Sequence, residues 1–307
     1  MEELKYVVDN STYVSIDYNK LDEFVDSITE VEYKHWYYDT NLDLNEKERI
    51  LLVFIIESMN FCFWKKPKWK IDYKGEIIKG SNALFYSIIK EVESNKEFLN
   101  IDNLHNMTFD DLKKVFNGVE GEIPFFENRY NNFKETIEFI YNNKNFYDEL
   151  FNIKTDTELL SYITSNLKHF DDKSSYKGKV IHFNKRATLL ANDLFYLSDT
   201  IHNNLKNMNN LTGCADYAIP RLLRDLQILI YTDDLKEMID NEIEIDHDSE
   251  MEIEIRANML YVIELIKDKL SKKDININSV ELDNVIWNET RTRERISNSH
   301  HTVTIFY

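Results

Sequence analysis

Apolar residues recur along most of the chain at the three- and four-residue spacing that is typical of amphipathic helices. Gly and Pro, which punctuate β-rich folds, number only 6 and 3 among 307 residues. The clearest helix begins at Asn45 or Glu46 and is apolar nearly all round between Ile50 and Ile56, as expected of a core helix. The pattern therefore predicts a mainly α protein.

The same spacing predicts further helices, with ends good to about 2–4 residues. They are Asn82–Ser94, Phe109–Phe116, Phe125–Tyr147, Thr157–His169, Asn184–His202, Tyr217–Tyr231, Glu252–Leu270 and Val280–Glu289. The segment KWKIDYKGEIIKG alternates around Lys74 and Gly75 and predicts a small β-hairpin, and the closing TVTIFY predicts a second β element. Since no repeat or long linker divides the chain, we expect a single compact helical domain over residues 1–307.

The charge and the cysteine content exclude several classes of function. The net charge of −18 weighs against a surface for duplex nucleic acid, because such surfaces neutralise phosphates with Lys and Arg. Cys62 and Cys214 are too few for a disulfide framework or a cysteine-based zinc site. The first ten residues carry no apolar leader, and the longest apolar run is too short for a membrane span. We expect a cytoplasmic protein without membrane contact.

Asp216 precedes a predicted helix whose first turn holds Pro220. An ordinary N-cap explains this aspartate, since its side chain would accept from amides two or three residues later. The same amides and the helix dipole would also keep a partly buried carboxylate ionised. An anion held in this way can stabilise a developing cation, so both interpretations stay open.

Polar exceptions on two other apolar helices are further candidates. Arg186 and Asp193 lie two turns apart, which predicts an internal ion pair, while Lys185 near the helix start could meet a substrate phosphate. Asp283, Trp287 and Asn288 recur at helical spacing and give one face with a carboxylate, an indole and an amide, which suits a flat heterocycle and would equally result from packing at the edge of the core. The chain has no P-loop or dinucleotide fingerprint, and the adjacent pair His300 and His301 lacks the spacing of a zinc site, so we expect no cofactor and no metal.

Six segments together resemble the queuosine salvage family, which hydrolyses queuosine 5′-monophosphate to release the base queuine. They are LVFIIESMNFCFW, HFNKRATLLANDLFYL, CADYAIP, EIEIRANMLYVIELI, LDNVIWNETR and the closing tyrosine. They follow the family's order and cover nearly the whole chain. The resemblance implies a mainly helical fold similar to helix-hairpin-helix DNA glycosylases.

The resemblance also implies roles for individual residues. Asp216 matches the family's catalytic aspartate, and Tyr217 keeps the tyrosine that follows it. Lys185 matches a lysine of the active-site region, and Asp283 matches an aspartate that holds the base. A carboxylate beneath the anomeric carbon suits cleavage of an N-glycosidic bond, which passes through an oxocarbenium-like ribose.

The chain departs from the family pattern where the base should bind. Relatives commonly have Phe at the position of Cys214, and Tyr and Asp at Asn284 and Asn288. They have His in the region of Tyr38, to which His35 is close. We predict that Tyr38, Cys214, Asn284 and Asn288 contact the substrate, which is queuosine 5′-monophosphate or a related 7-deazapurine nucleotide or nucleoside.

The sequence leaves two other functions open. A non-catalytic helical module that binds a modified base or nucleotide would explain the altered pocket. A DNA glycosylase is suggested by fold analogy alone and is opposed by the acidic charge. We expect a monomer whose partner is a small nucleotide, with no direct contact to nucleic acid.

Overall fold

Helices dominate the computed structural model, which describes residues 1–40 and 42–307. The α-helices are α1 (Glu2–Asn10), α2 (Tyr18–Ser27), α3 (Glu46–Met59), α4 (Ser81–Ser94), α5 (Ile101–Asn106), α6 (Phe109–Val115), α7 (Phe126–Asn142), α8 (Phe146–Asn152), α9 (Asp156–Asn166), α10 (Lys185–Leu197), α11 (Asp199–Leu205), α12 (Ala218–Asp225), α13 (Asp233–Asp240), α14 (Glu250–Ser271) and α15 (Ser279–Thr292). Short 3-10 helices are η1 (Trp36–Asp39) and η2 (Lys168–Phe170). The strands are β1 (Val14–Ile16), β2 (Lys70–Tyr73), β3 (Glu76–Lys79), β4 (Lys173–Tyr176), β5 (Lys179–His182) and β6 (Leu229–Tyr231).

The predicted core helix is confirmed as α3. It begins with a capping box, in which Asn45 accepts from the Glu48 amide at 3.1 Å and Glu48 accepts from the Asn45 amide at 2.8 Å. The helix predicted over 184–202 divides at Ser198, because its hydroxyl accepts from the Ile201 amide at 3.1 Å and starts α11. The helix predicted over 125–147 ends at Asn142 as α7, and a separate helix, α8, begins at Phe146.

Two sequence predictions about β structure are wrong. Residues 229–231 are not the end of a helix, because they pair as strand β6 with β1, more than 200 residues earlier in the chain. Residues 302–307 form no strand, and a single bridge joins His301 to Glu244. The hairpin around Lys74 and Gly75 is confirmed as β2 and β3.

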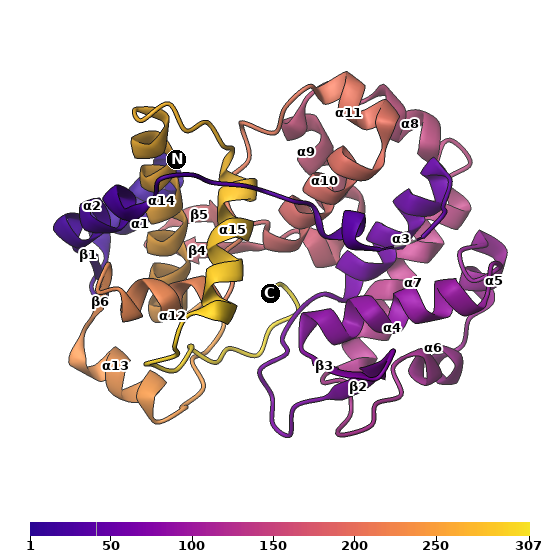
Figure 1. The fold of residues 1–307 in the computed structure, drawn as a ribbon, viewed down its shortest axis with the longest axis horizontal. Coiled ribbons are helices and arrows are strands. Elements are labelled where there is room, and N and C mark those ends of the chain that lie inside the picture. The colour runs from indigo at the N-terminus through magenta and orange to yellow at the C-terminus, as the bar shows by residue number, and fades with distance from the viewer. Residues whose placement is uncertain (41) are drawn as a thin grey trace.

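Two apolar clusters stand side by side (Figure 1). The α3 core is built around α3, which packs against α7 and α10. The α14 core is built around α14, which packs against α1, α2, α12 and α15. Segments far apart in sequence close the α14 core, including residues 4–25 and residues 253–286. The C-terminal end of the chain lies between the two clusters in Figure 1.

Contacts between α10 and α15 join the two cores at their boundary. The Tyr307 carbonyl, in the C-terminal segment, accepts from the Cys62 amide at 2.8 Å, just after α3. Within the described residues, none of the helices combines the length and the apolar character that a membrane crossing requires.

Candidate active site

Asp216 lies directly before α12 and is only 8% exposed. Its Oδ1 accepts from the Ala218 amide at 2.8 Å and from the Ile219 amide at 3.1 Å, which confirms the predicted capping bonds. Burial raises the pKa of Asp216 above its usual value, while the Lys185 charge, the two amides and a hydrogen bond from Trp287 act in the opposite direction. The site therefore contains a buried carboxyl surrounded by groups that favour its ionised form.

Asp283 approaches Asp216 from α15. Its Oδ2 accepts from the Cys214 amide at 2.9 Å, and the residue is 5% exposed. Burial and the negative charge of Asp216 raise the pKa of Asp283 well above its usual value. Gly213 leaves room for this carboxyl, since a Cβ there would lie 2.8 Å from Asp283 Oδ2. Two neighbouring carboxyls thus differ in their tendency to hold a proton.

Lys185 brings a positive charge to the same place from the start of α10. Its backbone amide donates to Asp172 Oδ2 at 3.2 Å, and the residue is 8% exposed. The charge of Lys185 favours the ionised forms of the Asp216, Asp283 and Glu57 carboxyls and so opposes the rise in their pKa values that burial causes. The apolar residues that follow Lys185 on α10 belong to the α3 core, whereas Ala215 and Leu282, which directly precede the two aspartates, belong to the α14 core, so the site forms where the two cores meet.

Glu57 in the last turn of α3 is a site residue that the sequence analysis missed. It is 2% exposed, and the side-chain amide nitrogen of Asn60 donates to both of its carboxyl oxygens at 3.1 Å. Burial and the nearby charge of Asp193 raise the pKa of Glu57 to about 8. A glutamate within the apolar run LLVFIIESM was the available signal, since a buried charge requires a partner.

Two buried arginines complete the C-terminal end of α3. Arg129 from α7 donates to the carbonyls of Met59 and Phe61, and Arg186 from α10 donates to the Ser58 carbonyl at 2.8 Å. Free carbonyls at a helix end require donors, and the positive charges suit the negative end of the helix dipole. These contacts fix the turn that carries Glu57.

The predicted ion pair between Arg186 and Asp193 is wrong. Arg186 is held by backbone carbonyls, whereas Asp193 Oδ1 pairs with His35 Nε2 at 2.8 Å and accepts from Trp36 Nε1 at 3.0 Å. His35 is 1% exposed and stacks on Tyr196, with ring centroids 5.1 Å apart. Sequence spacing could not reveal this arrangement, because His35 and Asp193 are 158 residues apart.

The remaining predicted site residues occupy different positions. Cys214 is buried beside Asp283, and burial raises the pKa of its thiol well above the usual value, which opposes a nucleophilic role. Tyr217 is half-buried next to Asp216. Tyr38 is 58% exposed, and the exposed Asn288 donates to Asn284 Oδ1 at 3.2 Å, so these three lie toward the surface.

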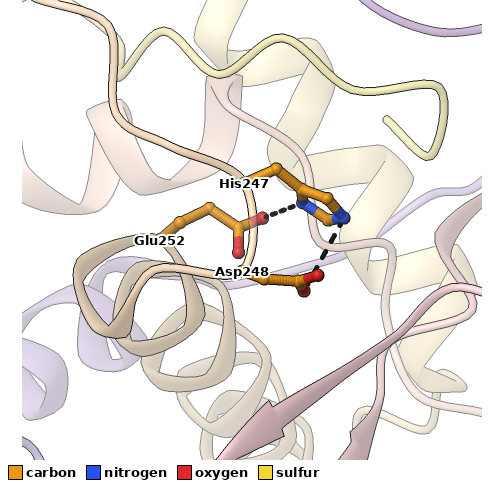
Figure 2. Close-up of side chains that lie close together, drawn as sticks. All are labelled: His247, Asp248 and Glu252. Carbon is orange, nitrogen blue, oxygen red and sulfur yellow. Dashed lines mark ion pairs between the residues drawn. The ribbon is translucent and has the colours of Figure 1, made fainter.

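A separate group of His247, Asp248 and Glu252 resembles a metal ligand set (Figure 2). His247 lies 3.7 Å from the Asp248 carboxylate and 3.5 Å from the Glu252 carboxylate. Glu252 is also paired with Arg256 at 3.3 Å, so a cation already neutralises the buried carboxylate of the group. The arrangement is explained by ion pairs that attach the loop before α14, and we assign no metal to it.

Comparisons with known proteins place these residues in a family context. Residues 40–307 match the family model described as queuosine salvage protein. A protein of Sphaerobacter thermophilus named queuosine 5′-phosphate N-glycosylase/hydrolase is 30% identical, over 83% of this chain and 80% of its own length. Proteins of the same name from Dictyostelium discoideum and Nematostella vectensis are 27% and 28% identical, over 89% and 90% of this chain and 84% and 87% of their own lengths.

Proposed function

Because the chain belongs to the queuosine salvage protein family, we propose that it hydrolyses the N-glycosidic bond of queuosine 5′-monophosphate or of a related 7-deazapurine nucleotide or nucleoside. Its curated relatives are named as glycosylases and hydrolases, and the chain is a glycosyl hydrolase. The product would be queuine or a related base, for salvage into tRNA modification.

The proposal is carried by the Asp216 carboxyl, buried before α12 and held by two amides beside Lys185. As the bond between C1′ and the base nitrogen breaks, its electron pair leaves with the base and positive charge builds on the ribose. An ionised Asp216 stabilises that charge or bonds to C1′. Water then adds its oxygen to C1′ and gives up one proton, and the departed base takes up one proton at the nitrogen that was bonded to C1′, so that the products are the free sugar phosphate and the neutral base.

The leaving base needs help that an ordinary purine obtains at N7. Queuine has carbon at that position, so protonation there is not available. Asp283 holds its proton more tightly than Asp216 does, because burial and the Asp216 charge both oppose its ionisation. A neutral Asp283 donates a hydrogen bond to another edge of the base and stabilises the negative charge that develops there.

The substrate-binding assignments extend from this centre. In the proposal, the Lys185 ammonium group binds the phosphate through its charge, and Cys214 and Tyr217 contact the base and the sugar. Tyr38, Asn284 and Asn288 form the outer rim, where the chain departs from its relatives. The single domain, the monomeric state, the cytoplasmic location and the likeness to helix-hairpin-helix glycosylases remain predictions.

A direct assay tests the proposal. Purified protein is incubated with queuosine 5′-monophosphate, with the dephosphorylated nucleoside and with guanosine 5′-monophosphate, and free base is measured by mass spectrometry. We expect release of queuine from the first substrate and no guanine from the third. Tight binding of the queuosine nucleotide without base release would reject the enzyme and favour the non-catalytic binding module.

A further inference from the structure

A second polar region lies along α10, beyond the group around Asp216. Lys185, Asn192 and Tyr196 recur at spacings of seven and four residues, which place them on one face of the helix, with Asp193 beside them. Lys185 and Asp193 both influence the charge of Glu57, so the two regions share one polar interior. Tyr196 donates to Glu281, which precedes Asp283 by two residues on α15.

Asp193 presents a free acceptor in this region. The residue is 4% exposed, and its Oδ1 takes both donors, His35 Nε2 at 2.8 Å and Trp36 Nε1 at 3.0 Å. Within the part of the chain that the structure describes, the buried Oδ2 has no hydrogen-bond partner. A buried carboxylate oxygen without a donor is costly, which points to a donor supplied from outside the chain.

The neighbouring residue offers a second acceptor. The Asn192 amide nitrogen donates to the Tyr33 hydroxyl at 3.0 Å, while its buried Oδ1 has no partner among the described residues. Trp36, which donates to Asp193, stacks on Phe85 with ring centroids 5.1 Å apart, and this contact fixes the position of the indole. Two fixed acceptors on adjacent residues suit a ligand that carries more than one donor.

The charges around Asp193 restrict the chemistry of that ligand. A phosphate brings acceptors and negative charge, and it would face like charge at Asp193. Hydroxyl and ammonium groups bring the donors that the two free oxygens require. Such groups occur at two places in the proposed substrate, the ribose hydroxyls and the cyclopentenediol arm with its secondary amine.

Resting on the proposed function, we propose that Asp193 and Asn192 form a specificity subsite that accepts hydrogen bonds from hydroxyl or ammonium groups of the nucleotide. His35 and Trp36 act as positioning residues, because they hold the Asp193 carboxylate so that Oδ2 remains free. The subsite recognises the substrate away from the glycosidic bond, and Asp216 acts at that bond.

Binding to a chain that cannot turn over separates this proposal from hydrolysis. All proteins carry Asp216→Asn, and dissociation constants are measured by calorimetry with and without Asp193→Asn. The ligands are queuosine 5′-monophosphate, 7-deazaguanosine 5′-monophosphate, which lacks the arm, and its 2′,3′-dideoxy analogue, which also lacks the ribose hydroxyls. Asp199→Asn, at an exposed aspartate just after α10, is the matched control.

We expect Asp193→Asn to weaken binding of the queuosine nucleotide by roughly ten- to a hundred-fold, because a donor amide replaces the free oxygen. If the arm supplies the donors, Asp193→Asn leaves the binding of both analogues unchanged. If the ribose supplies them, the substitution also weakens binding of 7-deazaguanosine 5′-monophosphate and leaves binding of the dideoxy analogue unchanged. Unchanged binding, or an equal loss for all three ligands, would overturn the subsite.

A second variant covers the case in which Asp193→Asn fails to fold. Asn192→Ala removes the neighbouring acceptor and leaves both partners of Asp193 in place, and it should show the same ligand pattern with a loss of about three- to ten-fold. Wild-type protein that binds but releases no base would reject the proposed function, while these binding constants would still decide the subsite.

Discussion

The Asp283 carboxyl accepts a hydrogen bond at 2.9 Å from the backbone amide of Cys214, two residues before Asp216. This bond attaches α15 to the segment that precedes α12, so the two acidic side chains are positioned by one local structure. Burial, together with the nearby charge on Asp216, opposes ionisation of Asp283 and raises its pKa well above the usual value. The chemistry assigned to the site depends on this rise.

Asp216→Asn should abolish most hydrolysis. The amide keeps the shape of the carboxyl but removes the negative charge that stabilises the ribose cation, so kcat should fall by about 10²–10³ or more. Binding of the nucleotide should be largely kept. Single-turnover release of base, together with calorimetry, measures both quantities, and near-normal turnover in a folded variant would refute the role of Asp216.

Gly213→Ala should damage the site through Asp283. The new methyl group would lie 2.8 Å from Asp283 Oδ2 and would displace the carboxyl from the Cys214 amide. We expect kcat/KM to fall by about ten-fold or more, with little change in the melting temperature. In an Asp283→Ala background the same substitution should add almost nothing, and independent, additive effects in this double-mutant cycle would contradict the mechanism.

Glu57→Gln should stabilise the protein increasingly as pH rises. The pKa of Glu57 is about 8 in the folded state against a usual value of 4.5, so the folded state binds the proton more tightly. The free energy of unfolding of the wild-type protein therefore falls between about pH 4.5 and pH 8, because in this range Glu57 is ionised in the unfolded chain and protonated in the folded chain. The melting-temperature difference between variant and wild type should widen over this interval. The exposed Glu237→Gln is the control, and a pH-independent difference for Glu57→Gln would argue against a protonated Glu57.

Arg129→Met should destabilise the fold strongly. Methionine fills much of the space but leaves the Met59 and Phe61 carbonyls at the end of α3 without the donors of Arg129, and each unpaired carbonyl costs about 1–3 kcal/mol. Urea unfolding should show a loss of about 3 kcal/mol or more. Arg293→Met removes a surface ion pair to Glu289 and should cost about 1 kcal/mol at most. Similar losses in both variants would mean that Arg129 does not support the helix end.

Local patterns predicted the helices better than the strands. The sequence analysis placed the start of α3 at Asn45 or Glu46, and in the structure the helix begins at Glu46 with a capping box between Asn45 and Glu48. Strand β6 could not be recognised in this way, because Leu229 belongs to an apolar run that suits a helix equally well. Its pairing with Ile16 depends on a partner distant in sequence, which overrides local propensity.

The same limit applies to the site. Resemblance to the family identified Asp216, Lys185 and Asp283, and the structure brings their charges together. Spacing along α10 suggested the wrong partner for Asp193, because the correct partner, His35, lies 158 residues earlier in the chain. Periodicity shows which face of a helix is polar, but the element packed against that face is fixed by tertiary structure.

The composition of the α14 core has a consequence for synthesis of the protein. Helix α1 buries Leu4 and Val7 against α14, which is made about 250 residues later. Because ribosomes add roughly 5–20 residues per second, α14 leaves the ribosome on the order of tens of seconds after α1. During that time the side of α1 that packs on α14 is open to chaperones, whereas the buried residues of the α3 core, apart from Val280, lie within residues 37–214 and are made before α14.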